Sequence, residues 1–323
     1  MTRASTAWGR GGWWRSASAS VRCARVHVLG RAPRFTRRAV ATLAAFAILA
    51  SPGRGQGSNP EPIHVPGPPA DVVLPLHPVV HPAFEVGEVL QYEFGWKGIA
   101  AAHATLSVET VPGEGPRRVK VVGTARTLSW LDWIWKMNDR VEAVFAAESL
   151  IPETFDFRQR EKGDKIDTHL SISWKDGVAT STRIKNGNPK EWFFPITRAY
   201  DPVSAAFLLR GVDLTPGDSK LVEVLNGKSR YLITMHVAGR ETVTVPAGTF
   251  DTFRLEPEIR NVNVPPPPPE KRKLRRVAIW ISTEAPRRIV KIESEVFWGS
   301  VYGEWIGPKF GDARARDESR PTG

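Results

Sequence analysis

The sequence predicts a mainly β protein: a large antiparallel curved sheet, a barrel or half-barrel, around one buried helix. From Phe84 onward, runs of alternating apolar and polar residues are separated by turns such as Asp176-Gly177, which is typical of antiparallel hairpins. One apolar run, 201–210, carries the end signals of a helix. Because a dozen or more strands do not remain one flat open sheet, we expect this sheet to curl.

Residues 1–55 are predicted to be a disordered leader with a secretory signal peptide. An apolar run at 39–50 is followed by small residues and is too short to span a hydrocarbon core of roughly 30 Å. Four arginines precede this run: Arg31, Arg34, Arg37 and Arg38. We therefore expect a periplasmic or otherwise exported protein of the Gram-negative envelope, without a transmembrane span in the mature chain. An uncleaved anchor or a transit-like leader is the alternative.

Charge and cysteine content exclude several kinds of partner. The 323-residue chain has a net charge of +11, but ten arginines and no acidic residue lie in residues 1–55, which leaves +1 for the rest. A nearly neutral body does not predict a nucleic-acid partner. The only cysteine, Cys23, lies in the leader, so the body has neither a disulfide nor a thiolate metal site. No cofactor is predicted.

Residues 56–83 are rich in proline and glycine and are predicted to form a mostly disordered linker. His77 and His81 have the spacing of a helical metal site, but Pro78 and Pro82 disfavour a helix there. We interpret both histidines as solvated linker residues.

The antiparallel β domain is predicted to span 84–306, and a polar tail follows at 307–323. Before the helix, strands are expected at 88–95, 101–109, 117–127, 139–146, 154–160, 165–174 and 178–185, and residues 191–194 lead into the helix. After it, they are expected at 220–225, 231–237, 241–246, 249–258, 275–282, 288–297 and 302–306.

The predicted helix begins after Asp201, whose carboxylate can accept a bond from a first-turn N–H. Pro202 suits the first helical position, and Gly211 is a plausible stop. The residues between leave almost no polar face, so we expect the helix to be buried against the curved sheet. Ser204 is expected to bond the helix backbone, since no nucleophile motif accompanies it.

Four segments resemble an exported bacterial family of unknown function, DUF3108. They are Phe84–Tyr92 (FEVGEVLQY), Tyr200–Ala205 (YDPVSA), Val245–Phe250 (VPAGTF) and Trp280–Ser282 (WIS). The resemblance implies a periplasmic or outer-surface protein with a mostly antiparallel β fold. It implies no activity and no catalytic residues.

Two stretches are candidate contact surfaces. Trp130, Trp133 and Trp135 would bind a partner, lipid head groups or an apolar ligand if they are exposed; alternatively they cover an open barrel end. A proline run at 265–269 predicts a projecting loop that docks a partner, an acidic polymer or anionic lipid, or is simply solvated. Its basic residues are Lys271, Arg272, Lys273, Arg275 and Arg276.

No catalytic or metal site is predicted. His103, His169 and His236 are isolated within strand-like segments, without ligand spacing. Our leading hypothesis is an exported envelope protein that binds an apolar ligand or lipid without catalysis, with Phe207 of the helix among the contacts. Such a protein should have an apolar cavity beneath the helix. The alternatives are an envelope assembly or scaffold factor and, less favoured, a hydrolase of envelope polymers.

Overall fold

The structure, a computed structural model, describes residues 61–263, 276–296 and 299–307. The predicted leader, the proline run, the four basic residues from Lys271 to Arg275 and most of the tail lie outside the described residues. Within them, fifteen strands form one sheet. The strands before the helix are β1 (Ile63–His64), β2 (Val89–Trp96), β3 (Ile99–Val111), β4 (Arg118–Thr127), β5 (Asn138–Ala146), β6 (Pro152–Glu161), β7 (Asp164–Ser173), β8 (Val178–Lys185) and β9 (Asn188–Pro195). Those after it are β10 (Ser219–Leu225), β11 (Arg230–Val245), β12 (Gly248–Asn261), β13 (Val277–Ser282), β14 (Ile289–Val296) and β15 (Gly299–Trp305).

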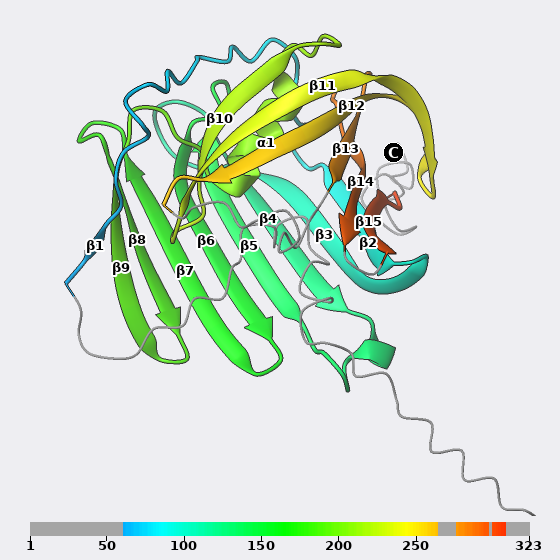
Figure 1. The fold of residues 1–323 in the computed structure, drawn as a ribbon, viewed down its shortest axis with the longest axis horizontal. Helices are drawn as coiled ribbons and strands as arrows, with labels where there is room; N and C mark the ends of the chain where they lie inside the picture. Colours follow the sequence, from blue (N-terminus) through cyan, green and yellow to red (C-terminus); the bar gives the residue numbers. More distant parts are fainter. Residues whose placement is uncertain (1–60, 264–275, 297–298, 308–323) are drawn as a thin grey trace, which may run out of the picture. The chain divides into compact units, whose positions relative to one another are not determined.

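The sheet is antiparallel, curved and not closed. Its order is β1-β9-β8-β7-β6-β5-β4-β3-β2-β15-β14-β13-β12-β11-β10, and only the β1–β9 pair is parallel. Figure 1 shows β10, β11 and β12 crossing the concave side, with α1 (Pro202–Gly211) beneath them. The predicted fold class is confirmed, because a long sheet of twisted strands curls around the helix.

The β10–β11 edge returns to the other half of the sheet. Arg230 Nη2 donates to the carbonyl oxygen of Pro195 at 2.6 Å, which joins the start of β11 to the end of β9. In the β10–β11 turn, Gly227 has a φ of +81°, and a Cβ there would lie 2.3 Å from Thr168 Cγ2. Only glycine allows the turn to rest this closely on β7.

Helix α1 begins with the predicted cap. Asp201 Oδ1 accepts from the backbone N–H of Val203 at 2.7 Å and of Ser204 at 3.1 Å. The N–H of Asp201 donates to Ser204 Oγ at 3.1 Å, so cap and hydroxyl form a reciprocal pair. The predicted stop at Gly211 is wrong: the helix includes this residue and its C-cap is Val212. Gly211 instead admits a neighbouring segment, since a Cβ would lie 2.9 Å from Val79 Cγ1.

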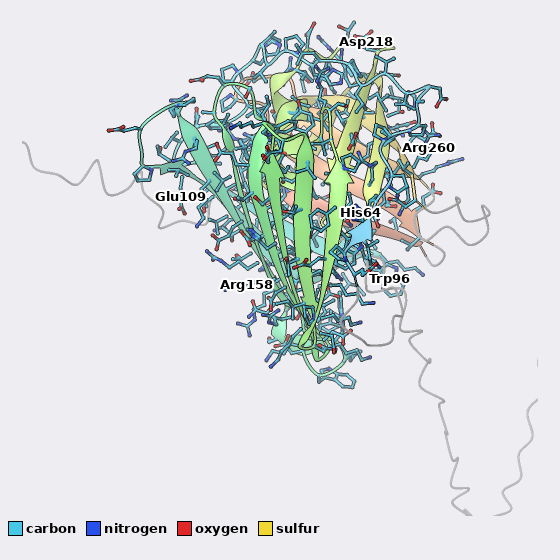
Figure 2. The ribbon with its side chains drawn as sticks, turned by 90° about the vertical axis from the view of Figure 1, so that its left-hand side faces the viewer. His64, Trp96, Glu109, Arg158, Asp218 and Arg260 are labelled. Atoms are coloured by element: carbon cyan, nitrogen blue, oxygen red, sulfur yellow. The ribbon has the colours of Figure 1, made fainter. Side chains whose placement is uncertain are left out.

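Residues 61–83 have little regular structure, as their prolines predict, but they are packed against the sheet rather than forming a free tether. β1 pairs with β9, beside which Figure 2 shows His64. The N–H groups of Val80 and His81 donate to the Gly211 carbonyl at 2.9 and 3.0 Å. His77 Nε2 lies 2.8 Å from the Leu221 carbonyl oxygen, so it donates and is not simply solvated. The proline content of the segment carried no information about these distant partners.

Two strand boundaries differ from the prediction for local reasons. The runs 231–237 and 241–246 belong to one strand, β11, whose register against β12 shifts between Val237 and Gly239. A bulge of this kind bends a strand without ending it. β9 begins at Asn188, because Asn186-Gly187 forms a tight hairpin turn instead of ending the strand region.

The main hydrophobic core lies between α1 and the concave face of the sheet. Phe207 of the helix meets Phe145 of β5, with ring centroids 5.6 Å apart, and Phe84 at 6.1 Å. Val203 and Leu208 are completely buried in the same cluster. The predicted burial of the apolar helix is therefore confirmed, and its position beneath β10–β12 defines the candidate site.

Candidate functional site

A cavity of about 160 Å³ lies beneath α1, between the helix and the strands that cross it. Its lining side chains are apolar except for Tyr92 and Arg210. They are Leu90, Tyr92, Phe94, Leu106, Pro202, Ala205, Ala206, Phe207, Leu209, Arg210, Val222, Val224, Ile233, Met235, Pro257, Ile259, Val277, Ile279, Ile289 and Ile292. The sheet supplies branched side chains and the helix supplies two alanines, so space remains between them.

The two polar groups of the lining already have partners. Tyr92 Oη donates to the carbonyl oxygen of Ile289 at 2.9 Å, and Arg210 Nη2 donates to the two carboxylate oxygens of Glu88 at 2.7 and 2.9 Å. Burial raises the pKa of Tyr92, so its hydroxyl stays protonated. Tyr92 Oη and the Nη2 group of Arg210 are thus committed to partners within the protein, and the cavity is suited to an apolar occupant.

The size of the cavity limits what it can hold. A cavity of about 150 Å³ lined by apolar side chains stays dry and accepts benzene or xenon, whereas pockets for drug-sized ligands measure roughly 300–1,000 Å³. The 160 Å³ here suits a small ring or the end of an alkyl chain. On the β11–β14 side, Ile233, Ile259 and Ile279 are only half-buried. Access from that side requires less rearrangement than access through the packed core.

A buried ion network holds the C-terminal end of α1 over the cavity. Arg210, 2 % exposed, pairs with Glu88 just before β2, and Arg288 Nε donates to the same carboxylate at 2.9 Å. Arg210 Nε also donates to the Arg287 carbonyl oxygen, and its guanidinium lies 4.7 Å from the centre of the Phe207 ring. The sequence analysis missed this network. Its one signal was a single arginine in an otherwise apolar helix.

The three predicted tryptophans do not act as one patch. Trp133 is 83 % exposed. Trp130, the middle residue of the 3₁₀ helix η2 (Ser129–Leu131), is also exposed. Trp135 is 9 % exposed and packs in a small second core with Phe94 and Met137. Trp135 is therefore not available as a contact residue, while a contact surface remains a prediction for the other two. None of the three lines the cavity, whereas Phe207 does.

The remaining predicted residues do not converge. Of the basic loop residues only Arg276 is described, and it pairs with Glu295 at 3.7 Å. His169 Nδ1 lies 2.8 Å from Asp156 Oδ1, while His103 is near Glu93 and His236 is near Ser219, each on a separate strand pair. Among the described residues, no group of three or more His, Cys, Asp or Glu side chains is placed to hold a metal ion.

In the part of the chain that the structure describes, no helix has the length and hydropathy needed to cross a membrane.

The fold and the cavity define a class: a curved antiparallel sheet wrapped around a buried helix, with an apolar space between them. The chain belongs to the DUF3108 family, described as a protein of unknown function, whose match covers residues 91–304. This confirms the resemblance found in the sequence. No curated protein matches the chain.

Several solved structures are similar at low identity. One is a β-barrel-like DUF1849 protein from Brucella abortus, at 9% identity and a TM-score of 0.42, covering 67% of this chain and 94% of that one. Another, from Bacteroides fragilis, is a candidate exported protein with a YmcC-like fold, at 10% identity and a TM-score of 0.32, covering 72% and 98%. A candidate lipoprotein from Parabacteroides distasonis has 10% identity and a TM-score of 0.33, with the same coverage.

Proposed function

We propose that this protein is an exported, non-enzymatic protein of the cell envelope, acting in the periplasm, that binds the apolar end of a ligand or lipid in the cavity beneath α1. The observation that carries the proposal is the cavity itself, about 160 Å³ with a lining that is apolar apart from two satisfied polar groups. The arginine-flanked apolar run at 39–50 supports export.

The energetics favour an alkyl chain. Each methylene removed from water contributes about 0.8 kcal/mol, so a few methylenes offset a substantial part of the cost of association. Because the lining is apolar apart from Tyr92 and Arg210, a polar ligand end would lose most of its hydration there without replacement. The occupant is therefore hydrocarbon, and any polar part of the ligand lies outside the cavity.

The test is calorimetric titration with decanol, a neutral amphiphile. Ala206→Leu adds three heavy atoms to a half-buried helix position that lines the cavity, so it should weaken decanol binding by about tenfold or more. Ala238→Leu makes the same chemical change at an exposed position of β11 outside the lining and should leave binding unchanged. Equal affinity of Ala206→Leu and the wild type would overturn the proposal.

A second candidate function, assembly with another envelope protein, is favoured by the exposure of Trp133. A photo-crosslinking residue at position 133 of the exported protein should give a discrete adduct with one envelope protein. The same residue at Glu109, an exposed position on β3, is the control. Identical labelling at both positions would contradict an assembly surface at Trp133.

A further inference from the structure

Four cationic side chains gather on the concave face of the sheet, at the end of β7–β9 near the β8–β9 turn. Arg183 and Lys185 belong to β8, Lys190 belongs to β9, and Lys228 comes from the β10–β11 turn. The register places Arg183 directly opposite both Thr168 and Lys190. Directly opposite residues of antiparallel strands share a face of the sheet.

The buried neighbours identify this face as the concave one. The side chains that share this face of β7, β8 and β9 include Thr168, Ser181 and Trp192. All three are buried. The β10–β11 turn, which carries Lys228, packs against this face. A Cβ on Gly227 would lie 2.3 Å from Thr168 Cγ2 and 2.9 Å from Ser181 Oγ. The next residue, Lys228, is therefore brought to the cations of β8 and β9.

This arrangement of like charges is unfavourable by itself. Like charges directly opposite each other on neighbouring strands destabilise a sheet. Burial lowers the pKa of Lys228, and the charges of Arg183, Lys185 and Lys190 lower it further. Burial also lowers the pKa of Arg183. An anion bound between these groups would offset the repulsion.

The described carboxylates near the cluster do not pair with Arg183 or Lys190. Asp164 pairs with Lys185 at 3.3 Å, and Glu223 is taken up by its buried pair with Arg230. Asp139 lies on the same face of the sheet as Lys185, but on β5, three strands from β8. At the usual strand spacing this separation is about 14 Å. Among the described residues, neither Arg183 nor Lys190 forms an ion pair. Arg183 Nη1 donates only to Thr168 Oγ1, at 3.2 Å.

We propose that Arg183, Lys190 and Lys228 bind the phosphate-bearing head group of an amphiphile whose alkyl end enters the cavity beneath α1. The alkyl part of this proposal rests on the proposed function. A guanidinium with two ammonium groups on one face matches the charge and the several acceptor oxygens of a phosphate. Ile233, which lines the cavity, is five residues from Lys228 in the chain, so their Cα atoms are at most about 18 Å apart. A single alkyl chain of medium length spans such a distance.

The experiment compares decyl phosphate, decanol and inorganic phosphate by calorimetric titration of the full chain. Decyl phosphate should bind about tenfold or more tightly than decanol, and Arg183→Gln and Lys190→Gln should each remove about tenfold of that affinity while leaving decanol binding unchanged. Arg158→Gln, on the exposed face of β6 (labelled in Figure 2), is the matched control and should have no effect.

A second readout separates binding from folding. Because Lys190→Gln removes a like charge opposite Arg183, it should raise the thermal midpoint of the ligand-free protein even as it weakens decyl phosphate binding. A lowered midpoint with unchanged affinity would overturn the site.

The outcomes also distinguish this inference from the proposed function. Equal affinity for decyl phosphate and decanol, insensitive to Arg183→Gln, would overturn the head-group site while cavity binding of decanol stands. If inorganic phosphate binds as tightly as decyl phosphate, the amphiphile proposal is overturned and the cluster is a site for free phosphate. The titration with decanol then tests binding in the cavity independently.

Discussion

The two sides of α1 are both rich in apolar residues but differ in what faces them. On one side, Val203 and Leu208 are completely buried in the main core and do not line the cavity. On the other, Ala205, Ala206 and Leu209 border about 160 Å³ of space. The difference shows that hydrophobicity predicts burial of a helix but not the quality of its packing. Packing depends on the size of the side chains that stand opposite.

The largest expected effect would break this comparison by releasing the helix. Glu88→Gln leaves the buried Arg210 without its carboxylate, which should lower the free energy of unfolding by about 3–5 kcal/mol in urea denaturation. Glu153→Gln removes the partially exposed partner of Arg118 and should cost less than about 1 kcal/mol. Similar small losses in both variants would mean that the network does not hold α1 in place.

A pair of adjacent leucines sharpens the comparison directly. Leu208→Ala removes a side chain packed on all sides and should cost about 2–5 kcal/mol. Leu209→Ala removes one that already borders empty space, makes fewer contacts there, and should cost about 2 kcal/mol or less. Both losses are measured by urea unfolding under identical conditions. If the two variants lose the same free energy, the two sides of the helix are packed alike.

The last expected effect is a pH dependence, and it concerns a buried carboxyl of the sheet. Burial raises the pKa of Asp139 on β5 to about 7, although the N–H of Arg160 donates to it at 2.7 Å. The folded state therefore binds more protons than the unfolded state between about pH 4 and 7, and stability falls as pH rises through this window, by up to about 1.4 kcal/mol per pH unit.

Asp139→Asn should flatten this pH dependence, because an amide oxygen still accepts the Arg160 N–H and does not titrate. Thermal midpoints measured from pH 4 to 8 provide the test. Glu223, whose pKa burial raises to about 7, contributes a slope of the same sign that the variant retains. If the thermal midpoints of Asp139→Asn vary with pH as those of the wild type do, the pH dependence of stability comes entirely from other groups.

Sequence reasoning succeeded where the signal is local. Asp176-Gly177 predicted a hairpin between β7 and β8, and Asp201 with Pro202 predicted the start of α1. It failed where a residue's role depends on a distant partner. Gly211 was interpreted as a stop, but its role is to admit residues 79–83, and the proline-rich linker gave no sign that it packs against the sheet. The bulge in β11 was interpreted as a strand break for the same reason.

The candidate site was predictable only in outline. An apolar helix beneath a curved sheet made a cavity a reasonable expectation, and Phe207, predicted as a contact residue, lines that cavity. The volume of the cavity did not follow from the sequence pattern. Nor did the Arg210–Glu88 pair, because the two residues are 122 positions apart. The cationic cluster was hidden too, since Lys228 reaches β8 and β9 only after the sheet curls.

The amino-acid sequence by itself determined the class of fold, the family, the helix cap and the burial of α1, because turns, caps and alternation act over a few neighbouring residues. Only the tertiary structure decided that one side of the helix is packed while the other borders a cavity, and which charges meet on the concave face. These features depend on how fifteen strands pair and curve, which brings together side chains that no local pattern connects.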